Sequence, residues 1–260
     1  MAVRRPPAGP TARWFVARAL DGFGPKLALF DAFAATTVAI IAAVVWRIGG
    51  GARASYELVV PMLGTGLRWS VALPIAWGAL GALEADRSAG LLDLAVRRGV
   101  SLQRWILGRA FGAAVLIAIL VGVPMIVTSL VLSGLGGGMD GALARLSLVV
   151  PSALLGIATG VVFGLGAVVI GALVPSRPLA LGALVAAASI GALVDLAVPG
   201  VVGVAAHQLV SPFLALEDLQ ALAFDVPRST TRGTAAAVAI ALVPLLGLRA
   251  ATSSLEARAR

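Results

Sequence analysis

The stretch AFGAAVLIAILVGVPMIVTSLVL, Ala110–Leu132, decides the fold class. It contains no charged residue, and a helix of about 20 consecutive apolar residues is long enough to cross the hydrocarbon core of a bilayer. The whole chain has the same character, because 60% of its 260 residues are hydrophobic and only 12% are charged. Soluble domains carry about 25% charged residues. The sequence therefore predicts an all-α integral membrane protein.

Five further stretches have the length and apolarity of membrane spans. They are Leu27–Val45, Leu58–Leu83, Ser147–Val174, Leu179–Val194 and Gly233–Leu248. We therefore expect one transmembrane domain of six helices over residues 27–250, with an N-terminal segment at 1–26 and a short tail at 251–260.

The 20 Lys and Arg residues set the expected orientation. Short loops rich in Lys and Arg stay in the cytoplasm. With the N-terminus inside, only six of the 20 lie outside: Arg47, Arg53, Arg68, Arg145, Arg228 and Arg232. Both termini are thus predicted to be cytoplasmic. The net charge of +8 reflects this topology and not a nucleic-acid partner, and the Ala-, Gly-, Val- and Arg-rich composition favours a bacterial cytoplasmic membrane.

Two segments outside the spans are amphipathic. In Thr11–Phe23, Val16, Leu20 and Phe23 share one helical face, which favours a helix in the plane of the membrane surface; a cytoplasmic extension of the first span is the alternative. Residues 195–232 begin apolar, break at Pro199-Gly200 and then become amphipathic. This outer segment is too short for two full spans, so a re-entrant or interfacial hairpin is predicted.

The inner loop at 84–109 contains two expected helices. Ser88 can cap a helix over Ala89–Arg98 that stops at Gly99, and Ser101 can cap a second helix that starts at Leu102 and leads into the third span. A short amphipathic helix held between two spans is suited to binding a cytoplasmic partner.

This loop and the overall plan resemble the permease subunit of type-2 ABC exporters. The resemblance extends over nearly the whole chain. It rests on Glu84, Gly90-Leu91-Leu92, Ser101, Arg104 and Gly108-Arg109, together with the six spans, the N-terminal surface helix and the re-entrant outer segment. At Arg98-Gly99-Val100-Ser101 the chain departs from the Pro-Ile/Val-Ser/Thr sequence that the family often has after the short helix.

The resemblance implies a dimeric permease whose inner-loop helix docks into an ABC ATPase subunit. Force would pass through Leu91, Leu94, Arg97 and Arg98, braced by Glu84 and Arg87, with Gly90, Ser101 and Arg104 in the same coupling loop. The chain lacks the Gly-x-x-x-x-Gly-Lys-Ser/Thr sequence that binds nucleotide phosphates. ATP and Mg would therefore be bound by the partner. A second permease copy or homologue, the bilayer and periplasmic or accessory components are the other expected partners.

Two further sets of residues in the spans are candidates for a role. Arg68 in the second span and Asp195 at the outer end of the fifth are expected at similar depth, where they could form an ion pair at an outer gate. Snorkelling of Arg68 to the headgroups is the alternative. Gly156, Gly160 and Gly164 repeat at four-residue spacing, which favours close helix packing within the chain over dimerisation.

No catalytic or metal site is expected, because the chain has no cysteine and one histidine. Two other functions remain open at the level of sequence. A membrane scaffold that transports nothing would keep the same spans and the same inner loop. An ion-coupled secondary transporter would need inverted repeats and carboxylates at the membrane midplane, and neither is found in the sequence.

Overall fold

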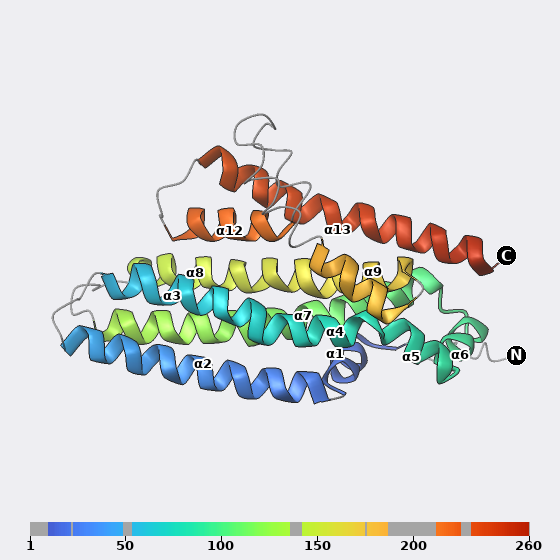
Figure 1. Cartoon of the computed structure of the whole chain (residues 1–260), viewed down its shortest axis with the longest axis horizontal. Helices are drawn as coiled ribbons and strands as arrows, with labels where there is room; N and C mark the ends of the chain where they lie inside the picture. The colour runs from blue at the N-terminus through green and yellow to red at the C-terminus, as the bar shows by residue number, and fades with distance from the viewer. Residues whose placement is uncertain are drawn as a thin grey trace, which may run out of the picture.

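The structure, a computed structural model, describes residues 10–21, 23–48, 54–135, 142–174, 176–186, 212–224 and 230–259. This described part is helical, without strands. Its long helices run along one common axis (Figure 1). They are α2 (Phe23–Ile48), the rod α3–η1–α4 (Ala54–Leu67, Arg68–Ala72, Leu73–Leu80), α7 (Leu102–Leu135) and the rod α8–η2–α9 (Ala142–Thr159, Gly160–Leu165, Gly166–Leu173).

Four helical stretches are long and apolar enough to cross a membrane among the described residues: Gly24–Ala42, Val59–Ser88, Leu102–Leu132 and Val149–Leu173. They match the first four predicted spans and confirm an all-α, membrane-embedded chain. Of the predicted fifth span, the structure describes a helix over Arg177–Ala186. The predicted sixth lies within α13 (Thr230–Ala259), which packs against α9.

The centre of the bundle is α7, which contacts α2, α3 and α8. Its contact with α8 and η2 is made through small residues. A Cβ on Gly156 would stand 2.6 Å from Gly122 Cα, and one on Gly164 would stand 2.5 Å from Ala114 N. A Cβ on Gly160 would overlap the Ala114 carbonyl oxygen. The three glycines thus let two helices of the same chain approach each other at backbone distance.

Two spans contain a π-helical segment at mid-length. η1 lies in the second span and η2 in the fourth, and the two segments contact each other. Trp69 of η1 and Phe163 of η2 pack edge to face, with ring centroids 6.4 Å apart. A π segment locally rotates the side chains that follow it around the helix axis, because it inserts an extra residue into a turn.

The predicted outer segment is described only in part. Residues 195–211 lie outside the described ranges, and Pro212–Ala223 form α12. α12 lies beside α13 and contacts α8 (Figure 1). At 12 residues it is about 18 Å long, which is shorter than the roughly 30 Å hydrocarbon core of a bilayer.

The N-terminal amphipathic segment forms α1 (Ala12–Leu20), with the Trp14 N–H donating to Thr11 Oγ1 at the cap. It runs across the bundle axis (Figure 1). Leu20, on the predicted apolar face, is 46% exposed, and Phe15 is the buried residue of the helix; the position of α1 in the membrane surface stays a prediction. Phe15 is selected because it fits a slot on α7.

Candidate functional site

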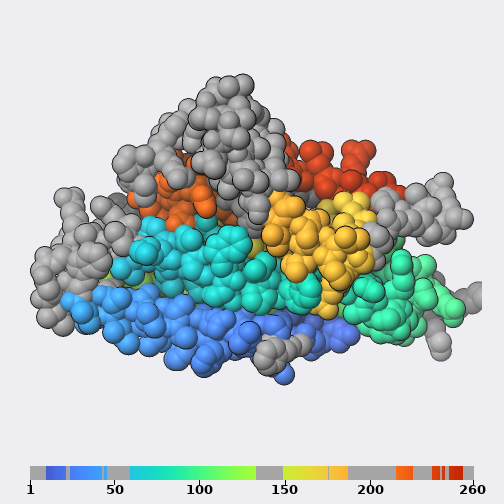
Figure 2. Space-filling view, in the orientation of Figure 1, coloured from blue at the N-terminus to red at the C-terminus, as the bar shows by residue number. Residues whose placement is uncertain are grey.

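One end of the bundle gathers several short elements. α1, α5 (Ala82–Ser88), α6 (Leu91–Arg97) and the start of α7 lie there, together with the C-terminal end of α13 (Figure 1). Figure 2 shows the α5–α6 segment, in green, at this end of the molecule. These elements form the candidate functional site.

The first predicted helix of the loop at 84–109 is present, but it covers Leu91–Arg97 and not Ala89–Arg98. The predicted cap is wrong, because Ser88 ends α5 and its hydroxyl donates to Ala85 O instead of capping α6. Gly90 has φ +69°, a conformation that breaks the helix and that side chains other than glycine's disfavour. α6 therefore starts at Leu91. The predicted cap of α7 is present, with Arg104 N–H donating to Ser101 Oγ over 3.3 Å.

A buried ion pair joins α5 to α7. The Asp86 side chain is 0% exposed, and its carboxylate accepts hydrogen bonds from Arg109 Nε (2.6 Å) and Trp105 Nε1 (2.8 Å). The second guanidinium nitrogen of Arg109 bonds to Asp86 Oδ1, so the pair is bidentate. Such charge-assisted, two-pronged bonds fix the relative orientation of both groups. They hold the loop against the third span.

An aromatic cluster covers this ion pair. Trp14 and Phe15 of α1 pack against Trp105 of α7, with ring centroids 5.4 Å and 5.6 Å from that of Trp105, and their own centroids are 5.1 Å apart. The Arg109 guanidinium lies over the Trp14 ring, 5.6 Å from its centroid. The slot for Phe15 is made by Gly108, where even a Cβ would clash with the ring. Leu91, Leu92 and Ala95 of α6 pack on the same cluster, so α1, α6 and α7 are joined.

The opposite side of α6 is exposed. Leu94 is 45% exposed, and Arg97 and Arg98 are exposed beside it, one helical turn further on. Residues three and four apart share a helix face. An apolar side chain next to two cations, on a helix fixed from behind, is suited to binding another protein.

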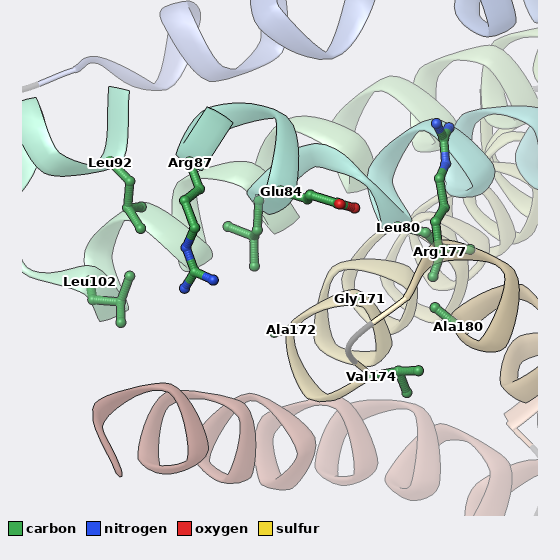
Figure 3. Close-up of a pocket in the computed structure, with 11 residues that line it drawn as sticks. Leu80, Glu84, Arg87, Leu92, Leu102, Gly171, Ala172, Val174, Arg177 and Ala180 are labelled. Carbon is green, nitrogen blue, oxygen red and sulfur yellow. The ribbon is translucent and has the colours of Figure 1, made fainter. Parts of the chain in front are cut away.

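Glu84 and Arg87 were predicted to brace the loop, and that role stays a prediction. Both are exposed, and neither side chain has a hydrogen-bond or ion-pair partner among the described residues. They line a cavity of about 260 Å³, with the rest of its wall formed by Leu80, Leu83, Leu92, Leu102, Gly171, Ala172, Val174, Arg177 and Ala180. Figure 3 shows Arg87 pointing into the space between α5 and the end of α9.

Arg68 lies far from this end, in η1, and is buried. Its guanidinium donates to Gln220 Oε1 of α12, and Gln220 Nε2 donates to Pro61 O over 2.9 Å. Snorkelling of Arg68 is therefore wrong. Asp195, its predicted partner, lies outside the described residues, and that pairing stays a prediction.

Within the described ranges, no three His, Cys, Asp or Glu residues lie close enough to hold a metal ion. Compared with protein-family models, with curated proteins and with solved structures, the chain has no match.

Proposed function

We propose that this chain is the membrane-spanning permease subunit of an ATP-driven exporter, and that its α5–α6 segment docks into a separate ATPase subunit. The observation that carries the proposal is the construction of α6. It is exposed on the Leu94 face and anchored on the other face by an aromatic cluster, and the buried ion pair fixes the adjoining α5 to α7. It also lies at the end of the second and third spans.

Anchoring matters because α6 has only seven residues. Isolated helices shorter than about 12 residues are marginal in water, so α6 would not keep its shape or position without the cluster behind it. A partner that moves α6 therefore also moves α5, through the chain, and α7, through Asp86 and Arg109. A flexible tether on a simple anchor protein would not need such a rigid attachment.

The finer topology is part of the same proposal. Six spans with both termini in the cytoplasm of a bacterium would put α1, the inner loop and the end of α13 on the ATPase side. The position of these elements at one end of the bundle supports this arrangement (Figure 1). α12, which is too short to span and is packed on the bundle, supports a re-entrant outer segment.

A second permease copy would pair through another surface than the glycines of η2, since those face α7. α2 offers such a surface, because only 22% of its apolar window is buried, against 50–61% for the other three candidate spans. Lipid would cover whatever part of α2 the partner leaves free.

The test is affinity purification of the tagged chain from its native membrane in mild detergent, with any ATPase partner identified and quantified. Leu94→Glu is the informative variant, because Leu94 is exposed whereas Leu91 packs on the aromatic cluster. Leu20→Glu in α1 is the matched control, since it has the same residue type, a nearly equal exposed fraction and a position at the same end.

A stoichiometric ATPase that is retained by Leu20→Glu and lost from Leu94→Glu is the expected result. Recovery of the folded chain with no ATPase would overturn the exporter assignment. An ATPase that Leu94→Glu retains in full would leave transport possible but refute docking through α6.

A further inference from the structure

The cavity lined by Glu84 and Arg87 lies where three candidate spans end. Glu84 and Arg87 occupy the last turns of Val59–Ser88, Leu102 is the first residue of Leu102–Leu132, and Gly171 to Leu173 close Val149–Leu173. Because the ends of spans lie at the boundary between hydrocarbon and water, the cavity is at the depth of the lipid headgroups.

The polar groups of the cavity have a net positive charge. Arg177 is already engaged, since its guanidinium donates to Trp77 O over 3.0 Å and lies 4.6 Å from the Trp77 ring centroid. Arg87 is not, and its N–H donors have no acceptor among the described residues. Glu84 is three positions away on the same helix, yet the two form no ion pair. Arg87 is thus an exposed guanidinium in the wall of the cavity that can bind an anion.

The remaining wall is mostly apolar. Leu80, Leu83, Leu92, Leu102 and Val174 surround the charged groups. In Figure 3 Arg87 extends toward the opening with Leu92 and Leu102 on one side and Val174 on the other. A fully hydrated inorganic anion gains nothing from such walls, whereas an anionic group attached to a hydrocarbon chain satisfies Arg87 and the leucines together.

We propose that this cavity binds the phosphate headgroup of an anionic phospholipid from the leaflet at this end of the bundle, with Arg87 as the phosphate ligand. Its volume of about 260 Å³ is just below the roughly 300–1,000 Å³ of pockets that enclose whole drug-sized ligands. It therefore holds a headgroup and the start of its chains, while the rest of the lipid stays in the bilayer. Basic pockets between helices on the cytoplasmic side are suited to such headgroups.

Glu84 determines which headgroup fits. Its carboxylate repels a second negative charge and would attract an ammonium group. Glu84 therefore affects the choice between an anionic headgroup and a zwitterionic headgroup that carries an amine. The net charge of the three ionic side chains, two arginines and one glutamate, favours the anionic lipid. This inference rests on membrane insertion alone, not on the proposed exporter function.

The experiment measures lipid binding to the delipidated full chain by native mass spectrometry. The probes are phosphatidylglycerol, phosphatidylethanolamine and phosphatidylcholine at equal concentration, with inorganic phosphate as a competitor. Arg87→Gln should weaken phosphatidylglycerol binding about tenfold, because it removes a charge-assisted bond. Glu84→Gln should strengthen it. Arg13→Gln, an exposed arginine on α1 at the same end, should leave it unchanged.

Three results would overturn the proposal. Equal retention of phosphatidylglycerol by Arg87→Gln and the wild type would exclude Arg87 as the ligand. Displacement of the lipid by millimolar phosphate would identify the site as one for a free anion. Preference for phosphatidylethanolamine, lost in Glu84→Gln, would identify a zwitterionic ligand. The Arg87 side chain has no hydrogen-bond or ion-pair partner among the described residues, so its replacement breaks no such bond. Size-exclusion chromatography checks that each variant is folded.

Discussion

Replacing Asp86 with asparagine should destabilise the protein more than any other single-atom change at this end of the bundle. Asparagine has nearly the shape of aspartate but no charge, so the Arg109 guanidinium would remain buried without a counter-ion. Its amide would also turn N–H donors toward a guanidinium that has only donors. If the amide oxygen takes the place of Asp86 Oδ2, the bonds from Trp105 Nε1 and Arg109 Nε survive, but the amide nitrogen then faces Arg109 Nη2, which loses its acceptor.

The magnitude follows from the burial of the pair. Asp86 is fully buried and Arg109 nearly so, and removing one partner of a buried pair costs about 3–5 kcal/mol. For chains of about this size, each kcal/mol shifts the melting temperature by about 2–4 °C. A thermal unfolding scan in detergent should therefore show a decrease of about 6–20 °C. Asp93→Asn is the control, since Asp93 is an exposed carboxylate on α6 and exposed substitutions change stability by about 0.5 kcal/mol or less.

A double-mutant cycle separates loss of the pair from general damage. Arg109→Met alone should destabilise the chain strongly, because it leaves the Asp86 carboxylate buried. Added to Asp86→Asn, it should cost less than it does alone, with a coupling energy of about 1–3 kcal/mol. Two results would refute this reasoning: an Asp86→Asn protein that melts within about 2 °C of the wild type, or a double variant whose loss equals the sum of the single losses.

Two further predictions concern the interior of the bundle. Gly160→Ala should lower stability by about 1–3 kcal/mol, because its Cβ overlaps α7 backbone. Gly166→Ala, with open space around the Cβ, should be neutral or stabilising by up to about 1 kcal/mol. Thermal melting compares the two variants, and equal melting temperatures would contradict the prediction. Gln220→Met should loosen the packing of α12 more than Arg68→Met does. Gln220→Met leaves the buried Arg68 charge without its hydrogen-bond acceptor, whereas Arg68→Met leaves only the Gln220 amide oxygen without its donor. Maleimide labelling of Ala221→Cys, in a chain that has no other cysteine, measures the loosening, and equal labelling rates would contradict the stated order.

Features that depend on short stretches of sequence were predictable. The four candidate spans follow from length and apolarity, and the Ser101 cap follows from a hydroxyl placed before an amphipathic run. The start of the first loop helix was not predictable in the same way. Ser88 is also a good cap residue, but the positive φ of Gly90 depends on how α5 and α6 pack. The helix therefore starts at Leu91, after Gly90, and not after Ser88.

The face of α1 was decided by its neighbour. Spacing predicts one apolar face through Val16 and Leu20, but it does not indicate which residue packs on the bundle. That residue is Phe15, because Gly108 and Gly112 leave room for its ring and backbone on α7. The shape of that slot belongs to a helix almost 100 residues away in sequence, so no local pattern could reveal it.

The residues that hold the loop were missed for a related reason. The motif drew attention to Glu84 and Arg87, whereas the buried bracing pair is Asp86 with Arg109. One signal was present in the sequence, because Trp105 and Arg109 are four residues apart on α7 and thus share a face. Two donors on one face of a helix that enters the membrane require an acceptor. Asp86 of α5 is the acidic residue that bonds to both.

The second span carries two buried polar groups that point to different partners, and its irregular turns explain how. Arg68 and Asp86 are 18 positions apart, which is about five turns of regular helix, so an uninterrupted helix would put both on one face. The π segment that begins at Arg68 and the turn at Gly81 rotate one relative to the other. Arg68 therefore meets Gln220 of α12, while Asp86 meets Arg109 of α7. Since buried polar groups in a span need partners, the Arg68–Gln220 and Asp86–Arg109 bonds resist separation of the α3–η1–α4 rod and α5 from α12 and α7. If a bound ATPase displaces α5 and α6 as proposed, this rod connects the displaced end to α12.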